Sequence, residues 1–274
     1  MMVIICNMYI AVYNKILETI IHIDDLHRYY NDSTSFTIII INPSNEINHC
    51  DMYSFGYEVD SYYPNDLIQG DSYDIYSIKT IKKFNLKITS DYINNLCKHG
   101  KINILEYLLQ NNKIIDYDTH ALRYASENGH VNVLEWWKNS GLELKYDEYA
   151  LSNASKYGYT NVLQWWKNSG LPLKYNECAL RDASISGYTN VLQWWKNSGL
   201  PLKYNKSALD SASYRGYIDV LKWWKNSGLP LKYDNRVVNH YSSKDWWKNS
   251  GLPISINDKD EVCVIMVNDK PVFL

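Results

Sequence analysis

The chain repeats itself every 29 residues, and this period constrains its fold more than any other feature. Single glycines and pairs of adjacent tryptophans both recur at this interval. The marks are Gly100, Gly129, Gly158, Gly187 and Gly216, then Gly141, Gly170, Gly199 and Gly228, and the leading tryptophans Trp136, Trp165, Trp194 and Trp223. A constant period over so many marks indicates one supersecondary unit stacked on copies of itself. We therefore predict an all-α helix-turn-helix solenoid.

The period also divides the chain. We predict a mixed α/β non-repeat region at 1–70, a degenerate half repeat at 71–88 and an array at 89–233. The array is followed by a shortened terminal repeat at 234–256 and a tail at 257–274. The five full repeats are 89–117, 118–146, 147–175, 176–204 and 205–233.

The first half of each repeat predicts a helix, which we name helix A. It begins at a residue type that caps helices, carries leucine and alanine three residues apart on one face, and ends at a glycine. The caps are Thr89, Asp118, Asp147, Asn176 and Asn205, the leucines are Leu122, Leu151, Leu180 and Leu209, and the alanines are Ala125, Ala154, Ala183 and Ala212.

The second half predicts helix B, which carries the apolar residues Val162, Leu163, Trp165 and Trp166 and stops at Gly170. Its expected first caps are Asn103, Asn132, Asn161, Asn190 and Asp219. The connector to the next repeat, residues 171–175, is too short for a third helix.

The paired tryptophans admit two interpretations, a ladder on which nucleic-acid bases stack or a core buried between repeats. We favour the core. The predicted core positions are Leu122, Leu151, Leu180 and Leu209 with Trp136, Trp137, Trp165, Trp166, Trp194, Trp195, Trp223 and Trp224.

Outside the array, the spacing of apolar residues predicts a helix over 11–30 and a buried strand over 35–41. A loop is expected over 44–74. Ile75, Tyr76 and Ile78 match helix B three periods away, which is the basis for the half repeat. The tail contains a strand pattern at 262–267, which we expect to fold over the end of the stack.

Composition excludes several classes of function. The chain has 28 basic and 30 acidic residues, a formal net charge of -2, which lacks the excess of a protein that binds many phosphates. The five cysteines, Cys6, Cys50, Cys97, Cys178 and Cys263, are odd in number and irregularly spaced, which favours a reducing compartment and no metal site. The apolar start lacks the features of a secretion signal. We expect an intracellular, cytoplasmic monomer that is not secreted and binds no membrane.

The chain contains no recognisable catalytic motif. It has no phosphate-binding glycine loop, no Gly-x-Ser-x-Gly elbow and no His-Glu-x-x-His, and its seven histidines have no repeated partner. We expect no enzyme activity, no cofactor and no small-molecule substrate.

Two lysine series follow the period and could track a phosphate backbone. They are Lys138, Lys167, Lys196 and Lys225 on helix B, and Lys145, Lys174, Lys203 and Lys232 in the connectors. We favour solvated charge near helix C-termini, where cations are stabilised by the helix dipole.

The repeat resembles the ankyrin repeat, whose common pattern is T-P-L-H-x-A-A-x-x-G-H-x-x-V-V-x-L-L-L-x-x-G. The residues at the family's offsets are Leu151, Ala154, Ser155, Gly158, Tyr159, Val162, Leu163, Trp165, Trp166 and Gly170, and the match covers 90–228. The family's period is four residues longer and its T-P-L-H opening is absent here, so its projecting fingers should be short. The W-W-K-N-S-G-L-P-L-K-Y segment is similar to ankyrin-type proteins of giant viruses of amoebae and of some fungi or protists.

This resemblance implies a non-enzymatic module that binds a host or viral protein along a concave surface lined by helix A. The positions that differ between repeats are candidate contacts, although duplication followed by neutral drift explains the differences equally well. The candidates are Arg123, Tyr124, Glu127, Ser152, Asn153, Lys156, Arg181, Asp182, Ile185, Asp210, Ser211 and Tyr214.

Two alternatives stay open. Residues 15–26 are faintly similar to the opening of an F-box, which would make the chain an adaptor of a ubiquitin ligase. A nucleic-acid-binding solenoid is the other.

Overall fold

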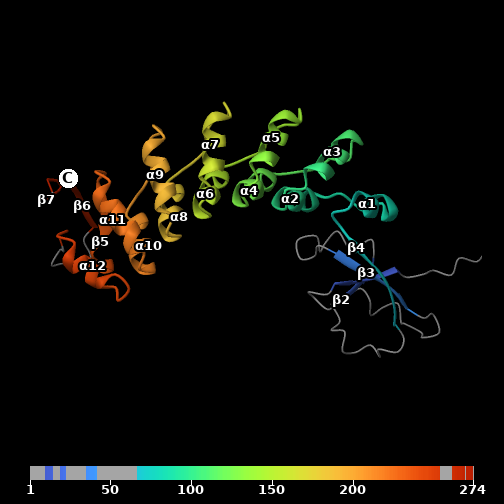
Figure 1. Cartoon of the computed structure of the whole chain (residues 1–274), viewed down its shortest axis with the longest axis horizontal. Coiled ribbons are helices and arrows are strands. Elements are labelled where there is room, and N and C mark those ends of the chain that lie inside the picture. Colours follow the sequence, from blue (N-terminus) through green and yellow to red (C-terminus); the bar gives the residue numbers. More distant parts are fainter. Residues whose placement is uncertain are drawn as a thin grey trace, which may run out of the picture. The chain divides into compact units, whose positions relative to one another are not determined.

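The computed structural model describes residues 10–14, 19–22, 35–41, 67–253, 261–268 and 270–273. It contains two compact units, Met1–Asp118 and Thr119–Leu274, and its array is rich in helices that pack in consecutive pairs (Figure 1). This architecture is compatible with a helical-repeat solenoid. No helix among the residues described has the length and apolar character needed to cross a bilayer.

The first unit opens with a four-stranded antiparallel sheet of order β2-β1-β3-β4. Its strands are β1 (Ile10–Asn14), β2 (Thr19–His22), β3 (Ser35–Ile41) and β4 (Leu67–Asp74). The strand predicted over 35–41 is confirmed.

Two predictions in this region are wrong. The segment 11–30 was predicted to be a helix, but it forms β1 and β2 where it is described, because its many isoleucine, valine and threonine residues suit a pleated strand. The predicted loop over 44–74 ends in β4, and the residues 44–66 lie outside the described part.

Three helices complete the first unit: α1 (Ile78–Phe84), α2 (Ser90–Lys98) and α3 (Ile102–Gln110). Helix α1 belongs to the predicted half repeat, but it begins five residues later than the period implies and ends at Asn85 in the left-handed conformation (φ 45°). The Tyr92 hydroxyl donates to the Ile75 carbonyl, which ties α2 to the end of the sheet. Thr89 caps α2 as predicted, since its hydroxyl accepts from the Tyr92 amide.

The second unit is built from four helix pairs, one for each repeat from 118–146 to 205–233. The helices A are α4 (His120–Glu127), α6 (Tyr149–Lys156), α8 (Cys178–Ile185) and α10 (Ser207–Arg215). The helices B are α5 (Val131–Asn139), α7 (Thr160–Asn168), α9 (Thr189–Asn197) and α11 (Ile218–Asn226).

The residues predicted to cap helix A bond to its first amide where their bonds are defined, although each lies two residues before the helix begins. The side-chain oxygens of Asp147, Asn176 and Asn205 each accept a hydrogen bond from the amide two residues on, at 2.9–3.1 Å. The predicted caps of helix B are wrong, because each helix B begins one residue before the expected asparagine or aspartate and has no side-chain cap.

Both predicted stop glycines have the left-handed conformation that favours glycine. Gly158 has φ 84° and Gly170 has φ 77°. At Gly158 an added Cβ would lie 2.8 Å from the ring of Tyr188 in the next repeat, whereas nothing lies within 4 Å at Gly170. The first glycine therefore serves both the turn and the contact between repeats.

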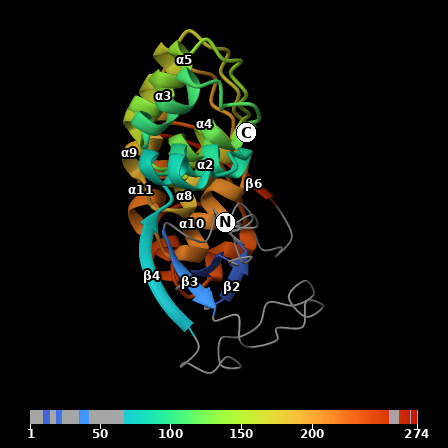
Figure 2. The same cartoon turned by 90° about the vertical axis from the view of Figure 1, so that its right-hand side faces the viewer.

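Helices A and helices B form separate rows, with the A row on the inner side of the bend within the second unit (Figures 1 and 2). Helices A lie close together because the residues between them are small. Ala150 and Ala154 of α6 are completely buried. Helices B are spaced more widely (Figure 1), and the completely buried indole of Trp166 on α7 reaches back to Ser126 on α4.

The second unit ends in a truncated repeat and a small sheet. The last connector forms β5 (Leu231–Asp234), a 3-10 helix η4 (Asn235–Asn239) replaces helix A, and α12 (Lys244–Asn249) is the last helix B. The tail forms β6 (Glu261–Val267) and β7 (Lys270–Phe273), and β6 pairs antiparallel with β5. The predicted strand at 262–267 is confirmed, and it covers the last connector of the array.

Candidate interaction surface

In four of the five Trp-Trp pairs, the second tryptophan joins neighbouring repeats. Its side chain is completely buried, and its Nε1 donates to a buried serine hydroxyl on helix A of the preceding repeat at 3.0–3.1 Å. The four pairs are Trp166 with Ser126, Trp195 with Ser155, Trp224 with Ser184 and Trp247 with Ser213. Each of these serines is needed for stacking and is unavailable to a partner.

The first tryptophan of each pair is only partly buried, so its assignment to the core has to be corrected. Trp165 lies edge-on against Trp166, with ring centroids 5.1 Å apart. Its Nε1 donates to Glu135 of the preceding repeat at 2.7 Å, and this bond lowers the pKa of Glu135. The equivalent bonds join Trp194 to Gln164 and Trp223 to Gln193 at 3.0 and 2.9 Å.

The connectors form a third ladder. The hydroxyl of Tyr146 donates to the carbonyl of Pro172, 2.9 Å away in the next connector. In return, Lys174 Nζ donates to the carbonyl of Tyr146 at 3.0 Å and lies 4.5 Å from the centre of its ring. Lys203 makes the same two contacts with Tyr175. These connector lysines therefore help to hold adjacent repeats together. The sequence had suggested only phosphate binding or solvated charge for them.

The twelve candidate contact residues lie on one face of helix A, at positions spaced by three and four residues. Several of them join adjacent repeats. Arg123 pairs with Asp147 at 2.7 Å and lies over the ring of Tyr149, and Asn153 donates to Glu127 at 2.9 Å.

Four further candidates are also engaged. Asp182 accepts from the guanidinium of Arg181, and Asp210 accepts from the amide of Asp234 at 2.9 Å. Ser152 is 1% exposed and donates to the carbonyl of Glu148, so its side chain is not accessible to a partner.

The other candidates remain accessible on the helix A face. Their side chains are partly or fully exposed and form no hydrogen bond or ion pair with the neighbouring repeats in the described part of the array. They are Tyr124, Lys156, Ile185, Ser211 and Tyr214.

Sequence reasoning missed one position on this face. Tyr149 is 48% exposed in the first turn of α6, and Arg123 of the preceding repeat lies 4.4 Å from its ring centre. The residues at this position differ in all four repeats: His120, Tyr149, Cys178 and Ser207. Comparing the four repeats in the sequence would therefore have identified this position as variable.

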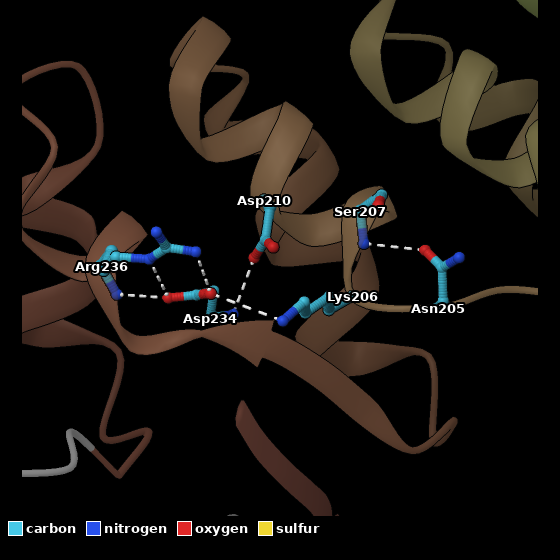
Figure 3. A network of polar contacts seen from close by, with 6 residues as sticks. All are labelled: Asn205, Lys206, Ser207, Asp210, Asp234 and Arg236. Carbon is cyan, nitrogen blue, oxygen red and sulfur yellow. Dashed lines mark hydrogen bonds and ion pairs between the residues drawn. The ribbon is translucent and has the colours of Figure 1, made fainter. Parts of the chain in front are cut away.

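A polar network holds the C-terminal end of the helix A row (Figure 3). The carboxylate of Asp234 accepts from Nε and Nη2 of Arg236, at 2.9 and 2.7 Å, and lies 3.5 Å from Nζ of Lys206. Hydrogen bonds from Arg236 and its positive charge hold the pKa of Asp234 far below its usual value. The network fixes the last connector against α10.

Next to this network an aromatic group reaches the surface. The ring of His240 lies between Tyr214 and Tyr241, with ring centroids 4.8 and 4.5 Å away. Ser242 donates to the carbonyl of Ser213 at 2.7 Å, so its oxygen accepts from His240 Nδ1 at 2.8 Å. Tyr241 is 87% exposed. The group thus extends the accessible face beyond α10.

Among the described residues, no group of three or more histidine, cysteine, aspartate or glutamate side chains is placed to hold a metal ion. A comparison with models of protein families finds no match, and a comparison with curated proteins finds no relative. The function is therefore inferred from the geometry of the array.

Proposed function

We propose that the chain is a non-enzymatic, ankyrin-like interaction module that binds a protein partner along the accessible helix A face of its second unit. Lys156, Ile185 and Tyr214 would make the central contacts. We further propose that it acts inside a cell, on a host or viral protein, as the resemblance of its repeats implies.

This proposal rests on one observation: the repeated residues hold the repeats together, whereas the variable residues do not. The repeated tryptophans, serines, tyrosines and connector lysines bond one repeat to the next. The accessible helix A residues differ between repeats and make no such bonds. A row of different, partly exposed side chains on closely packed helices offers a protein partner a specific surface.

Neither alternative has comparable support. The F-box alternative needs a helical opening, whereas Thr19–His22 forms a strand. Nucleic-acid binding would use the tryptophans and both lysine series, but the tryptophans and the connector lysines are engaged in bonds between repeats. We therefore propose neither.

Proximity labelling in the cell where the protein acts would test the proposal. The wild type is compared with the triple variant Lys156→Ala/Ile185→Ala/Tyr214→Ala, whose side chains form no polar bonds between repeats. We expect the variant to lose a defined subset of the labelled proteins. Melting curves of both proteins show whether the variant is folded.

A matched control replaces Asn132, Asn161 and Asn190, exposed residues of helices B, by alanine. We expect it to keep the subset lost by the helix A variant. If the helix A variant labels the same proteins as the wild type, the helix A face is not the binding surface.

A further inference from the structure

The helix B side of the second unit carries an exposed lysine at the same place in each repeat. These five residues, named here the lysine row, lie in the last turn of each helix B. They are Lys138, Lys167, Lys196, Lys225 and Lys248. Lys225 is partly exposed and the others are fully exposed, and none forms an ion pair with a residue that the structure describes.

The lysine row differs from the repeated side chains that bond one repeat to the next. The repeated indoles, serines, tyrosines and connector lysines bond to a neighbouring repeat, whereas these lysines do not. A favourable helix dipole would accept any cation in the last turn. It does not explain why the same cation occupies one position in five helices whose helix A partners have diverged.

The charge of this side is opposite to that of the whole chain. Helices α5, α7, α9, α11 and α12 together hold seven lysines and three carboxylates, a net charge of +4, whereas the formal charge of the chain is -2. Around Lys167 and Lys196 the sequence has no acidic residue from 149 to 176 or from 183 to 209. Lysine is the only charged residue type within α7 and α9, and the other exposed polar groups on these two helices are uncharged: Asn161, Gln164, Asn168, Asn190, Gln193 and Asn197.

We propose that the lysine row is a second interaction surface, which binds an acidic polypeptide segment running across the helices B. Charge complementarity selects an anionic partner. A polypeptide fits better than a nucleic acid, because Glu135, Asp219 and Asp245 lie on the same side. A phosphate chain carries a charge on every nucleotide and would meet these carboxylates, whereas a polypeptide can place neutral residues opposite them.

The indoles beside the row support the same choice. Single-stranded nucleic acid gains affinity by stacking bases on open aromatic faces. Trp165 and Trp194 are partly buried between helices B, each against its paired tryptophan, and their Nε1 groups are bonded to the preceding repeat. They make the surface that presents the lysines rigid. Because they offer no open face for stacking, electrostatic attraction to the lysines is the main contribution to binding.

Fluorescence anisotropy on the full chain tests this proposal. The probes are a labelled peptide of alternating glutamate and glycine, about 20 residues long so that it reaches about 65 Å when extended, and a single-stranded oligonucleotide of similar length. We expect the peptide to bind and the affinity to fall as salt screens the charges. The charge reversal Lys167→Glu/Lys196→Glu should weaken binding about tenfold or more, equivalent to about 1.4 kcal/mol.

The matched control Lys79→Glu/Lys270→Glu makes the same change of net charge on exposed lysines outside both the row and the helix A face. It should change peptide affinity less than about twofold. The proposal is overturned if the control weakens binding as much as the reversal, if the peptide does not bind, or if the oligonucleotide binds more tightly than the peptide. The test is independent of the helix A face, because Ile185→Ala/Tyr214→Ala should leave peptide binding unchanged.

Discussion

Trp195 and Ser155 are 40 residues apart in sequence, yet the indole Nε1 of Trp195 donates a 3.0 Å hydrogen bond to the Ser155 hydroxyl. Both side chains are completely buried. The serine hydroxyl in turn donates to the Leu151 carbonyl at 2.9 Å, so its proton and a lone pair are both used. A buried polar pair of this kind fixes the register between one repeat and the next, because any slip would leave the buried Trp195 Nε1 group without its acceptor.

Replacing this serine should therefore destabilise the array. In Ser155→Ala the Trp195 Nε1 group stays buried without an acceptor, which should cost about 1–3 kcal/mol of the free energy of unfolding. Urea denaturation followed by circular dichroism measures the change. Ser211→Ala, at a partly exposed serine of the same helix row, is the control and should cost less than about 0.5 kcal/mol. Equal losses in the two variants would contradict the role given to Ser155.

The two tryptophans of one pair should differ in their importance. Trp166→Ala removes a completely buried indole and should cost about 3–5 kcal/mol. Trp165→Ala removes a partly exposed indole and its bond to Glu135, so the loss should be smaller, about 1–3 kcal/mol. Because repeat arrays need not unfold in one step, hydrogen exchange of the amides in α7 and α9 should accompany the denaturation curves. The reverse order of the two losses would show that the outer indole holds the stack.

The sequence period was sufficient to predict the helix pairs, their stop glycines and the burial of the repeated leucines. It could also have separated the two tryptophans, since Trp166 lies three and four residues after Leu163 and Val162 on the buried face of helix B. Trp165 lies one residue earlier and therefore does not share that buried face. We missed this because the resemblance placed both indoles at core positions.

Other features could not be predicted from one repeat at a time. The pairing of Arg123 with Asp147 depends on how far helix A of one repeat lies from the next cap, which only the stacked geometry determines. The strands β1 and β2 were predicted as a helix because short apolar segments fit either period, and pairing between distant segments decides between them. The accessible helix A residues were therefore identifiable only after those with structural partners had been removed.

Alanine should be tolerated less well at the glycine that ends helix A than at the glycine that ends helix B. Both Gly158 and Gly170 have positive φ, so each substitution by alanine pays about 1 kcal/mol of backbone strain. Gly158→Ala also brings a Cβ to 2.8 Å from the Tyr188 ring, and shifting that ring should add about 1 kcal/mol or more. Thermal melting of the two variants measures the difference. In a Tyr188→Ala background the extra cost of Gly158→Ala should disappear, and its persistence would contradict the steric explanation.

The C-terminal end of the array should lose stability in acid. Arg236 keeps the pKa of Asp234 in the folded chain far below the value of about 3.9 expected for an unfolded aspartate. The unfolded chain therefore takes up the proton first as the pH falls. The stabilisation is fully present well above pH 4 and decreases below it, toward the pKa of the folded state.

The variant Asp234→Asn isolates this contribution, because it loses the ionic bonds to Arg236 and Lys206 at every pH. At neutral pH it should be less stable than the wild type by about 1–3 kcal/mol. Melting temperatures measured between about pH 7 and pH 2 should approach each other as the unfolded wild-type chain takes up a proton on Asp234. Asp219→Asn removes a carboxylate that is 89% exposed and 3.3 Å from Lys222, so it should leave the acid profile nearly unchanged. Parallel curves for wild type and Asp234→Asn across the whole range would mean that the aspartate does not couple protonation to the folding of this end.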